Sequence, residues 1–362
     1  MKSVVENTWT PFAPVAGLPP FTPAVLSEIL DGGQAFRWHR TPQNKAGGGA
    51  PPNFASEIWL GQWSGCVVRL RPAADGALEF SASTALAPQV ARELPRYLVT
   101  DRNWPALTDS LPWRSDAHLA RGLAVFPGLR ILRQPFGETL LGFLCSATKQ
   151  IVQIKQMLAL LAERHGRPIG RASGLQTPKN SPPAQGGPFP PADLHAPLHA
   201  LPTWEALATI PEKELRACQL GFRARFISET ARFIAAHPGW LDETEALPYP
   251  AAQARLRELP GVGEKIADCV LLFGAGRLEA FPVDTWILQA MAARYGLAGW
   301  KPAQVAQFGR AHFGPLAGLA QQFLFAHERR VAREAGSPAG AAGIPRPRTE
   351  QGPVVRFMPQ KN

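Results

Sequence analysis

The stretch "ARLRELPGVGEKIADCVLLFGAG", residues 254–276, constrains the fold more than any other part of this chain. Its pattern predicts a helix, a tight hairpin and a second helix. We expect Pro260 to stop the first helix, and Gly261 and Gly263 to allow positive φ without placing side chains in front of the backbone. Free N–H groups beside a helix amino terminus suit an anion such as a DNA phosphate. By itself, however, "PGVG" is equally typical of an ordinary turn between helices.

The second helix carries a lysine where a cleft is expected. Lys265 and Cys269 are four residues apart and share one face, while Ile266, Val270 and Phe273 take the adjoining face toward the core. A lysine is a nucleophile only after its ammonium loses a proton, which desolvation or a nearby helix amino terminus promotes. Most lysines are simply solvated, so the case for Lys265 as a nucleophile depends on what accompanies it.

A carboxylate follows in "AFPVDTWILQAMAARYG", where Asp284 directly precedes a predicted helix. One role for this position is an N-cap that accepts a backbone N–H. Another is a carboxylate at the mouth of the cleft, which stabilises positive charge on a sugar ring and helps to manage protons. The two roles are compatible, because a cap fixes the carboxylate in place.

Composition limits the partners and the chemistry. The chain has 362 residues, a formal net charge of +10 and 45% hydrophobic residues, which indicates a basic globular protein. Its charge favours nucleic acid or an acidic membrane surface without distinguishing them. No signal-peptide pattern or long apolar run occurs, so we expect a soluble, intracellular protein. The four cysteines show no C-x-x-C spacing, which argues against a zinc ribbon, an iron–sulfur loop or a disulfide framework.

The hydrophobic periodicity predicts an α+β protein in which an amino-terminal antiparallel sheet packs on an all-helical domain. Apolar and polar residues alternate as in strands up to about residue 86, whereas the recurrence from about Ala117 onward is helical. Segments rich in Pro and Gly are expected to be loops or linkers. The predicted organisation is a flexible amino terminus (1–15), a β-rich domain (16–113) with a loop (41–54), a helical domain (114–332) with a flexible insertion (about 168–200), and a disordered tail (333–362).

"LPGVGEKIADC" followed by "FPVDTW" resembles the helix-hairpin-helix DNA glycosylases. Four further stretches resemble the 8-oxoguanine DNA glycosylase/lyase family within that superfamily, and they occur in the same order: "GGQAFRW", "LLGFLCSATKQI", "LGFRARF" and "LAQQFLF". The likeness runs from about residue 20 to 332. It implies a base-excision repair enzyme with AP lyase activity, acting as a monomer on double-stranded DNA that contains an oxidised purine.

The resemblance assigns roles to single residues. It makes Lys265 the nucleophile at the sugar C1′ and Asp284 its electrostatic partner. Cys269 and Phe325 would sandwich the flipped base, with Gln321 reading its Watson–Crick edge; without the family, Phe325 is more typical of a core residue and Gln321 of a surface one. The remaining role, a backbone carbonyl offered to the damaged base, falls to Gly33.

The role of Gly33 has a chemical reason. Oxidation at C8 turns guanine N7 from an acceptor into an N–H donor. A fixed carbonyl therefore gains a hydrogen bond from the lesion but faces a lone pair in normal guanine, which leaves a buried acceptor unpaired. Outside the family, the two adjacent glycines would be interpreted only as a turn.

The resemblance also implies DNA contacts. Phe222 stands where a tyrosine wedge is common, and stacking requires only the ring. The other implied contacts are Arg223, Thr148, Gly261, Val262 and Gly263. The chain departs from the family at Ala147, Thr148, Lys149, Gln150 and Gln153, positions that address the base opposite the lesion, and at Trp286, where histidine is frequent. The preference for the opposite base therefore stays open.

The resemblance implies no required cofactor or metal, although backbone carbonyls around Gly261 can hold a monovalent cation in this superfamily. One alternative is a related glycosylase with another substrate; alkylated-base enzymes generally lack the lysine, and the iron–sulfur branch needs a four-cysteine loop. A second alternative is a non-catalytic DNA-binding protein that uses only the hairpin. That alternative does not account for Lys265 together with Asp284.

Overall fold

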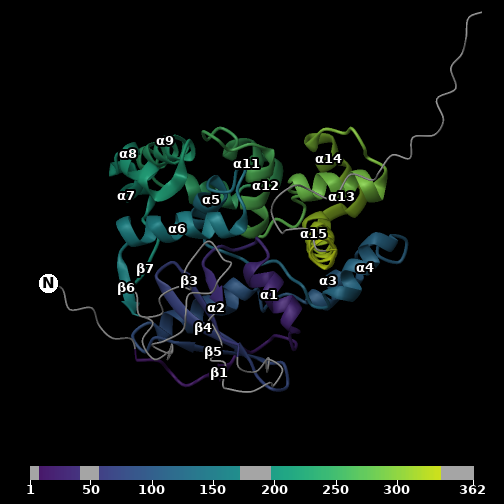
Figure 1. The fold of residues 1–362 in the computed structure, drawn as a ribbon, viewed down its shortest axis with the longest axis horizontal. Coiled ribbons are helices and arrows are strands. Elements are labelled where there is room, and N and C mark those ends of the chain that lie inside the picture. Colours follow the sequence, from purple (N-terminus) through teal and green to yellow (C-terminus); the bar gives the residue numbers. More distant parts are fainter. Residues whose placement is uncertain (1–7, 41–56, 172–196, 336–362) are drawn as a thin grey trace, which may run out of the picture.

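The computed structural model describes residues 8–40, 57–171 and 197–335 (Figure 1). An antiparallel sheet with its own helices forms one layer, and the other helices form the rest of the molecule. This confirms the predicted α+β class. The sheet comprises β1 (Ala13–Pro14), β2 (Trp38–Arg40), β3 (Trp59–Trp63), β4 (Cys66–Pro72) and β5 (Leu78–Ala82). The helices α1 (Pro23–Asp31) and α2 (Ala87–Leu98) contact this sheet, and α3 (Trp104–Asp109) follows α2.

The sheet runs in the order β1-β5-β4-β3-β2, and every neighbouring pair is antiparallel. Of the amino terminus expected to be flexible (1–15), residues 1–7 lie outside the described residues, whereas the part that is described contacts the sheet. β1 pairs with β5, Trp9 forms a bridge with Ser83, and the guanidinium of Arg69 lies over the Trp9 ring. The described part of the amino terminus is thus ordered by contacts with a sheet edge that lies far away in the sequence.

The helical part begins with α4 (Ala117–Val125) and α5 (Phe136–Leu144), and the other elements follow along the chain. They are α6 (Ile151–His165), β6 (Pro168–Arg171), β7 (Pro197–His199), α7 (Trp204–Thr209), α8 (Glu212–Leu215), the π-helix η2 (Arg216–Leu220), α9 (Arg223–Ala236), α10 (Trp240–Ala246), α11 (Tyr249–Leu256), α12 (Glu264–Phe273), α13 (Thr285–Tyr295), α14 (Pro302–Phe313), the 3-10 helix η3 (Gly314–Leu316) and α15 (Ala317–Glu334).

Three segments differ from the expected organisation. The periodic run around "LLGFLCSATKQI" breaks between α5 and α6, where Thr148 has φ +54°. The predicted insertion at about 168–200 starts and ends in paired strands, β6 and β7, whereas 172–196 lies outside the described residues. The expected loop 41–54 also lies outside them. α15 continues to Glu334, and the remaining tail is not described.

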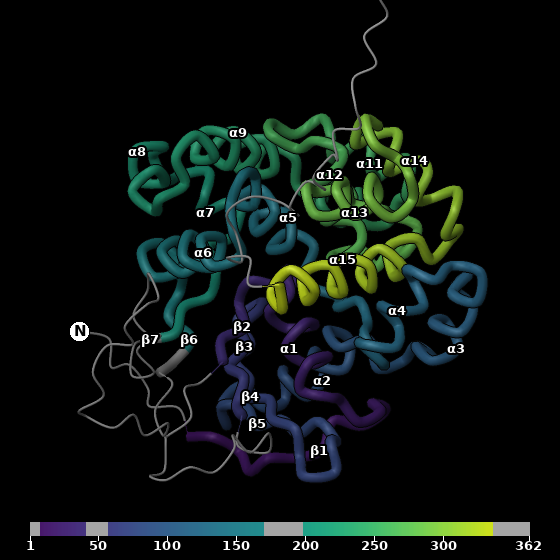
Figure 2. The backbone as a smooth tube through the Cα atoms, turned by 45° about the vertical axis from the view of Figure 1, so that its right-hand side comes forward, coloured from purple at the N-terminus to yellow at the C-terminus, as the bar shows by residue number. Residues whose placement is uncertain are grey.

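α15 joins the two parts of the molecule. It packs on α4 and α13, and it crosses the middle of the fold between the sheet layer and α13 (Figure 2). Buried side chains form one continuous cluster from the sheet through these helices. The amino-terminal turn at Gly33 and the carboxy-terminal helix therefore share one core, and both can contribute to a site at their junction.

Candidate active site

The hairpin between α11 and α12 consists of backbone turns. Pro260 lies within these turns and does not end α11, contrary to expectation. α11 already stops at Leu256, and the Val262 N–H donates to the Leu259 carbonyl at 3.1 Å. Gly261 has φ +79°, as expected, but Gly263 has φ −89° and ψ 179°, so the expected positive φ is wrong there. Gly263 is instead the N-cap of α12 and has no side chain with which to cap it.

Gly261 is required by sterics as well as by conformation. A Cβ at this position would lie 2.6 Å from the Phe226 ring of α9. Gly261→Ala should lower the free energy of unfolding by about 2–4 kcal/mol, the sum of left-handed strain and overpacking. Urea denaturation checks this, with Gly263→Ala as the control, since its Cβ would meet nothing within 4 Å. Equal losses in the two variants would contradict the account.

Lys265 lies at the start of α12 and points toward the end of α5. Its Nζ donates to the Ser146 hydroxyl at 3.2 Å and lies 5.2 Å from the centre of the Phe143 ring. The two helices are held together by the stacked rings of Phe143 and Phe273, 5.6 Å apart. The break after α5 therefore brings Ser146 to the amine, so that the amine is half-buried against a hydroxyl and an aromatic face.

Asp284 is the N-cap of α13, as predicted. Its Oδ1 accepts the Ile287 N–H at 2.8 Å. Burial raises the pKa of Asp284, although the Ile287 N–H and the charge of Lys265 favour its ionised form. Lys265 and Asp284 thus interact electrostatically across one site.

A cavity of about 1090 Å³ contains both residues. Its volume lies just above the usual range of about 300–1,000 Å³ for ligand pockets. Four other predicted residues line it, namely Gly33, Thr148, Gly263 and Phe325. Its basic lining residues are Lys149, Lys155, Lys265, Arg329 and Arg333. The structure therefore brings together the proposed nucleophile, its carboxylate partner and two proposed base contacts in a positively charged cavity.

Gly33 adopts a backbone conformation that disfavours other residues, with φ +113°. A Cβ added there would lie 3.3 Å from Cδ1 of Ile151 and 3.8 Å from Cε1 of Phe325. The next residue anchors the turn: Gln34 donates to the Arg130 carbonyl at 2.9 Å and accepts the Leu132 N–H at 3.0 Å. The Gly33 backbone therefore lies against Phe325.

Two predicted base contacts, Cys269 and Gln321, are not among the residues that line the cavity. They are only 4% and 3% exposed. Burial raises the pKa of Cys269 to about 12, which keeps its thiol neutral. The Gln321 amide donates to the Pro282 carbonyl at 3.1 Å and accepts from Gln322 at 2.7 Å. In this structure the amide of Gln321 holds the segment before Asp284.

The predicted wedge lies outside the cavity. Phe222 is 51% exposed and directly precedes α9, and its ring meets that of Phe226 edge to face at 6.0 Å. Arg223 stacks on Phe222, and its guanidinium donates to the Ala147 carbonyl and to the Thr148 hydroxyl. The wedge, the loop at Thr148 and the hairpin at Gly261 are thus connected through α9. Val262 is buried within the hairpin.

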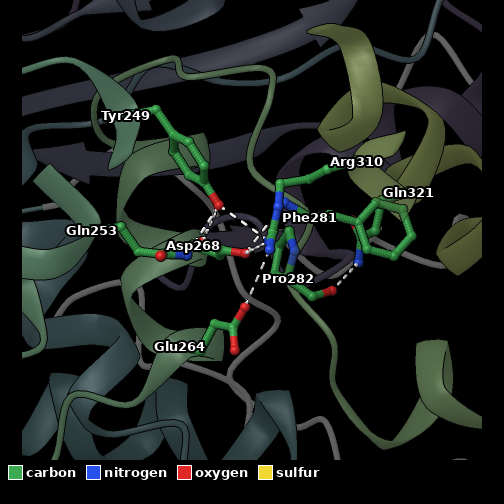
Figure 3. A network of polar contacts seen from close by, with 8 residues as sticks. All are labelled: Tyr249, Gln253, Glu264, Asp268, Phe281, Pro282, Arg310 and Gln321. Carbon is green, nitrogen blue, oxygen red and sulfur yellow. Dashed lines mark hydrogen bonds and ion pairs between the residues drawn. The ribbon is translucent and has the colours of Figure 1, made fainter. Parts of the chain in front are cut away.

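A buried polar network holds Phe281 and Pro282, which precede Asp284 in the chain (Figure 3). Asp268, which is fully buried, accepts hydrogen bonds from Tyr249 at 2.8 Å and Gln253 at 2.6 Å, and its other oxygen accepts the Phe281 N–H at 3.3 Å. Arg310 lies 3.6 Å from the same oxygen. Because Gln321 holds the adjacent Pro282 carbonyl, the segment leading to Asp284 is fixed from α12 and from α15.

Asp268→Asn should remove one acceptor oxygen from this network. An asparagine can satisfy either the Tyr249 and Gln253 donors or the Phe281 N–H, and the group left unpaired costs about 1–3 kcal/mol of unfolding free energy. Thermal and urea denaturation measure this loss. Asp242→Asn, an exposed substitution on α10, is the control; unchanged stability in Asp268→Asn would contradict the assigned hydrogen bonds.

Sequence reasoning missed three residues of the site. Ser146 and Asp268 lie within quoted motifs, but no pattern indicated that they would contact Lys265 or Phe281. Arg329 was detectable, because Gln321, Phe325 and Arg329 recur every four residues and so share one face of α15. The face of α15 that lines the cavity therefore extends one helical turn beyond Phe325, the last residue predicted on it.

Neither a metal-binding cluster nor a membrane-spanning helix occurs among the described residues. No group of three or more His, Cys, Asp or Glu side chains in this part of the chain is arranged to hold a metal ion. No helix among the same residues has the length and apolarity to cross a bilayer.

The chain is similar to known proteins along most of its length. The sequence profile described as "8-oxoguanine DNA glycosylase, N-terminal domain" matches residues 20–140. The chain is 29% identical to the N-glycosylase/DNA lyase OGG1 of Arabidopsis thaliana over 82% of this chain and 75% of that protein.

Two solved structures share the fold over most of the chain. The Clostridium acetobutylicum 8-oxoguanine glycosylase/lyase, bound to double-stranded DNA with cytosine opposite 8-oxoguanine, superposes with a TM-score of 0.68 at 28% identity, covering 86% of this chain and 92% of that one. MBOgg1 in complex with a low-affinity DNA ligand superposes with a TM-score of 0.70 at 25% identity, covering 91% and 100%. Together these matches support the 8-oxoguanine DNA glycosylase family of N-glycosylase/DNA lyases for this chain.

Proposed function

We propose that this protein removes 8-oxoguanine from double-stranded DNA and then nicks the strand at the resulting site. The observation that carries the proposal is the shared cavity: the Lys265 amine and the Asp284 carboxylate line the same space as Gly33 and Phe325. One pair supplies groups for chemistry at a sugar, and the other supplies a carbonyl and an aromatic face for a base. Double-stranded DNA is the partner in this proposal, and the enzyme acts as an intracellular monomer.

In the proposed reaction, the unprotonated Lys265 amine attacks C1′. The C1′–N9 bond breaks, its electron pair leaves with the base, and the base is protonated. The nitrogen, now bonded to C1′, gives up one proton. Its lone pair then forms a C1′=N double bond while the C1′–O4′ bond breaks, and O4′ takes up a proton, so that the ring opens to a protonated Schiff base. Loss of a C2′ proton then expels the 3′ phosphate by β-elimination, and water releases the enzyme. The Asp284 carboxylate stabilises the positive charge that develops on the sugar.

The proposed base contacts combine two residues of the cavity wall, Gly33 and Phe325, with two that the family resemblance assigns, Cys269 and Gln321. The Gly33 carbonyl accepts the N7–H of the lesion, Phe325 and Cys269 contact the two faces of the base, and Gln321 pairs with its Watson–Crick edge. Because Cys269 and Gln321 are buried behind the cavity wall, base entry must expose them. The hydrogen bond from Gln321 to the Pro282 carbonyl then links base recognition to the Asp284 segment.

The proposed DNA contacts lie around the cavity. Phe222 fills the space left by the extruded nucleotide, and Thr148 faces the same duplex. Arg223 is only 2% exposed and donates to Thr148, so it supports this surface and would reach DNA only after that contact opened. The backbone N–H groups of Gly261 and Gly263 bind a phosphate next to the amino terminus of α12. The Val262 N–H already donates to the Leu259 carbonyl, so Val262 contributes by holding the hairpin in shape. No cofactor takes part in the proposed reaction, and a monovalent cation on the hairpin carbonyls would only support the hairpin.

The experiment is borohydride trapping. Purified protein is mixed with duplexes that carry one 8-oxoguanine opposite each of the four bases, and a covalent protein–DNA band is sought. A band supports the proposal and ranks the opposite bases. Tight binding without base release or a band would contradict it, and would leave a glycosylase for another lesion or a binding protein.

A further inference from the structure

We propose that Arg329 is a positioning residue for base recognition. It holds the Gly32–Gly33 turn and the Phe325 ring in fixed positions relative to each other. This inference rests on the proposed function of the same cavity. Its contribution is to base specificity, and it takes no part in the chemistry at the sugar.

The contacts of Arg329 join three elements. Its Nη1 donates to Oε1 of Glu28 on α1 at 2.8 Å and also to the Gly32 carbonyl. Its guanidinium carbon lies 5.2 Å from the centre of the Phe325 ring, one turn earlier on α15. The side chains of Arg329 and Glu28 are only 12% and 8% exposed. A single guanidinium thus ties α1, the glycine turn and the aromatic wall of the cavity together.

The hydrogen bond to Gly32 fixes a peptide plane next to Gly33. The Gly32 carbonyl and the Gly33 N–H belong to one planar peptide unit. On the other side of Gly33, the Gln34 carbonyl accepts the side-chain amide of Gln134 at 2.6 Å. The Gly33 carbonyl belongs to the Gly33–Gln34 peptide, which lies between two held peptides, Gly32–Gly33 and Gln34–Ala35, so its direction is limited from both sides. Without Arg329 the Gly32 carbonyl would lose this partner, and the Gly32–Gly33 peptide would be held only from Gly32, whose N–H donates to the Glu28 carbonyl at 2.9 Å.

Carbonyl direction matters because the lesion differs from guanine at the N7 edge by a single hydrogen. A displacement of about 1 Å in a positioned group can cost on the order of 100-fold in rate. Arg329 also stacks on Phe325, so its loss would loosen the wall against which the base packs. Both effects concern a base in the cavity, whereas attack by Lys265 on a sugar without a base requires neither.

The test compares a substrate that requires base recognition and C1′–N9 cleavage with one that requires neither but still requires attack by Lys265 on C1′. Single-turnover rates are measured on a duplex with 8-oxoguanine and on the same duplex with a preformed abasic site. We expect Arg329→Met to slow base release roughly 10- to 100-fold while borohydride trapping at the abasic site stays within about 3-fold of wild type. Arg329→Lys, which keeps the charge but loses the planar fork, should have a smaller effect in the same direction.

Arg330→Met is the matched control. Arg330 lies on the same helix and pairs with Glu334 at 2.7 Å, but this pair is exposed, so the substitution should leave both rates unchanged. Parallel loss of both activities in Arg329→Met and in Arg329→Lys would show a purely structural role and overturn the inference. Unchanged base release in Arg329→Met would also overturn it. Failure of the wild type on both substrates would instead overturn the proposed function.

Discussion

Lys265→Gln is expected to abolish the covalent protein–DNA band and to slow base release on the order of 10⁴-fold or more, the scale seen when a nucleophile is removed from other enzymes. The amide of glutamine cannot form a Schiff base. It can still donate to the Ser146 hydroxyl, which Lys265 contacts at 3.2 Å, so the fold and DNA binding should persist. Borohydride trapping and single-turnover base release on an 8-oxoguanine duplex measure the two losses.

The matched control for this change is Lys213→Gln. Lys213 is exposed on α8 and does not line the cavity, so its loss changes the net charge equally without touching the site. Normal base release by Lys265→Gln would show that another group, such as an activated water, displaces the base. Loss of DNA binding along with activity would assign the effect to folding or docking instead, and denaturation curves would distinguish the two.

Asp284→Asn is expected to have the second largest effect. Asparagine is also a favourable N-cap, so it can still accept the Ile287 N–H and preserve the start of α13. What it lacks is the negative charge that faces the developing cation. Removal of one such stabilising group costs about 100- to 1,000-fold in rate, and we expect base release to fall by that factor. Single-turnover rates give the size of the loss, with Asp242→Asn as the exposed control.

The pH dependence gives an independent check on Asp284. Because burial raises its pKa, the carboxyl keeps its proton to a higher pH than an ordinary aspartic acid, whose pKa is about 3.9. Base release requires the ionised form, so activity should be lost as pH falls through this raised value. In Asp284→Asn that acidic limb should disappear while the residual rate stays low. A limb at the same position in both proteins would assign the titration to another group.

Sequence alone determined the local chemistry of the site. Short sequence patterns predicted the local conformation at Gly261, Lys265 and Asp284. They could do so because caps, turns and helix faces depend on residues that are close in the sequence. Asp284 is the predicted N-cap, and Ile266, Val270 and Phe273 are buried as their spacing predicts. The α+β arrangement followed from the change in periodicity. Local pattern nevertheless failed for the φ of Gly263 and for the end of α11.

Tertiary structure decided which groups meet. Ser146 contacts Lys265 across 119 residues, and Arg329 contacts the Gly32 carbonyl across 297. No spacing rule predicts such pairs, since they depend on how α5, α12 and α15 pack around one core. The ordering of β1 and the break between α5 and α6 have the same origin. A residue's local preference is worth tenths of a kcal/mol to about 1 kcal/mol, whereas burial of its side chain is worth more, so packing overrides the local pattern where the two disagree.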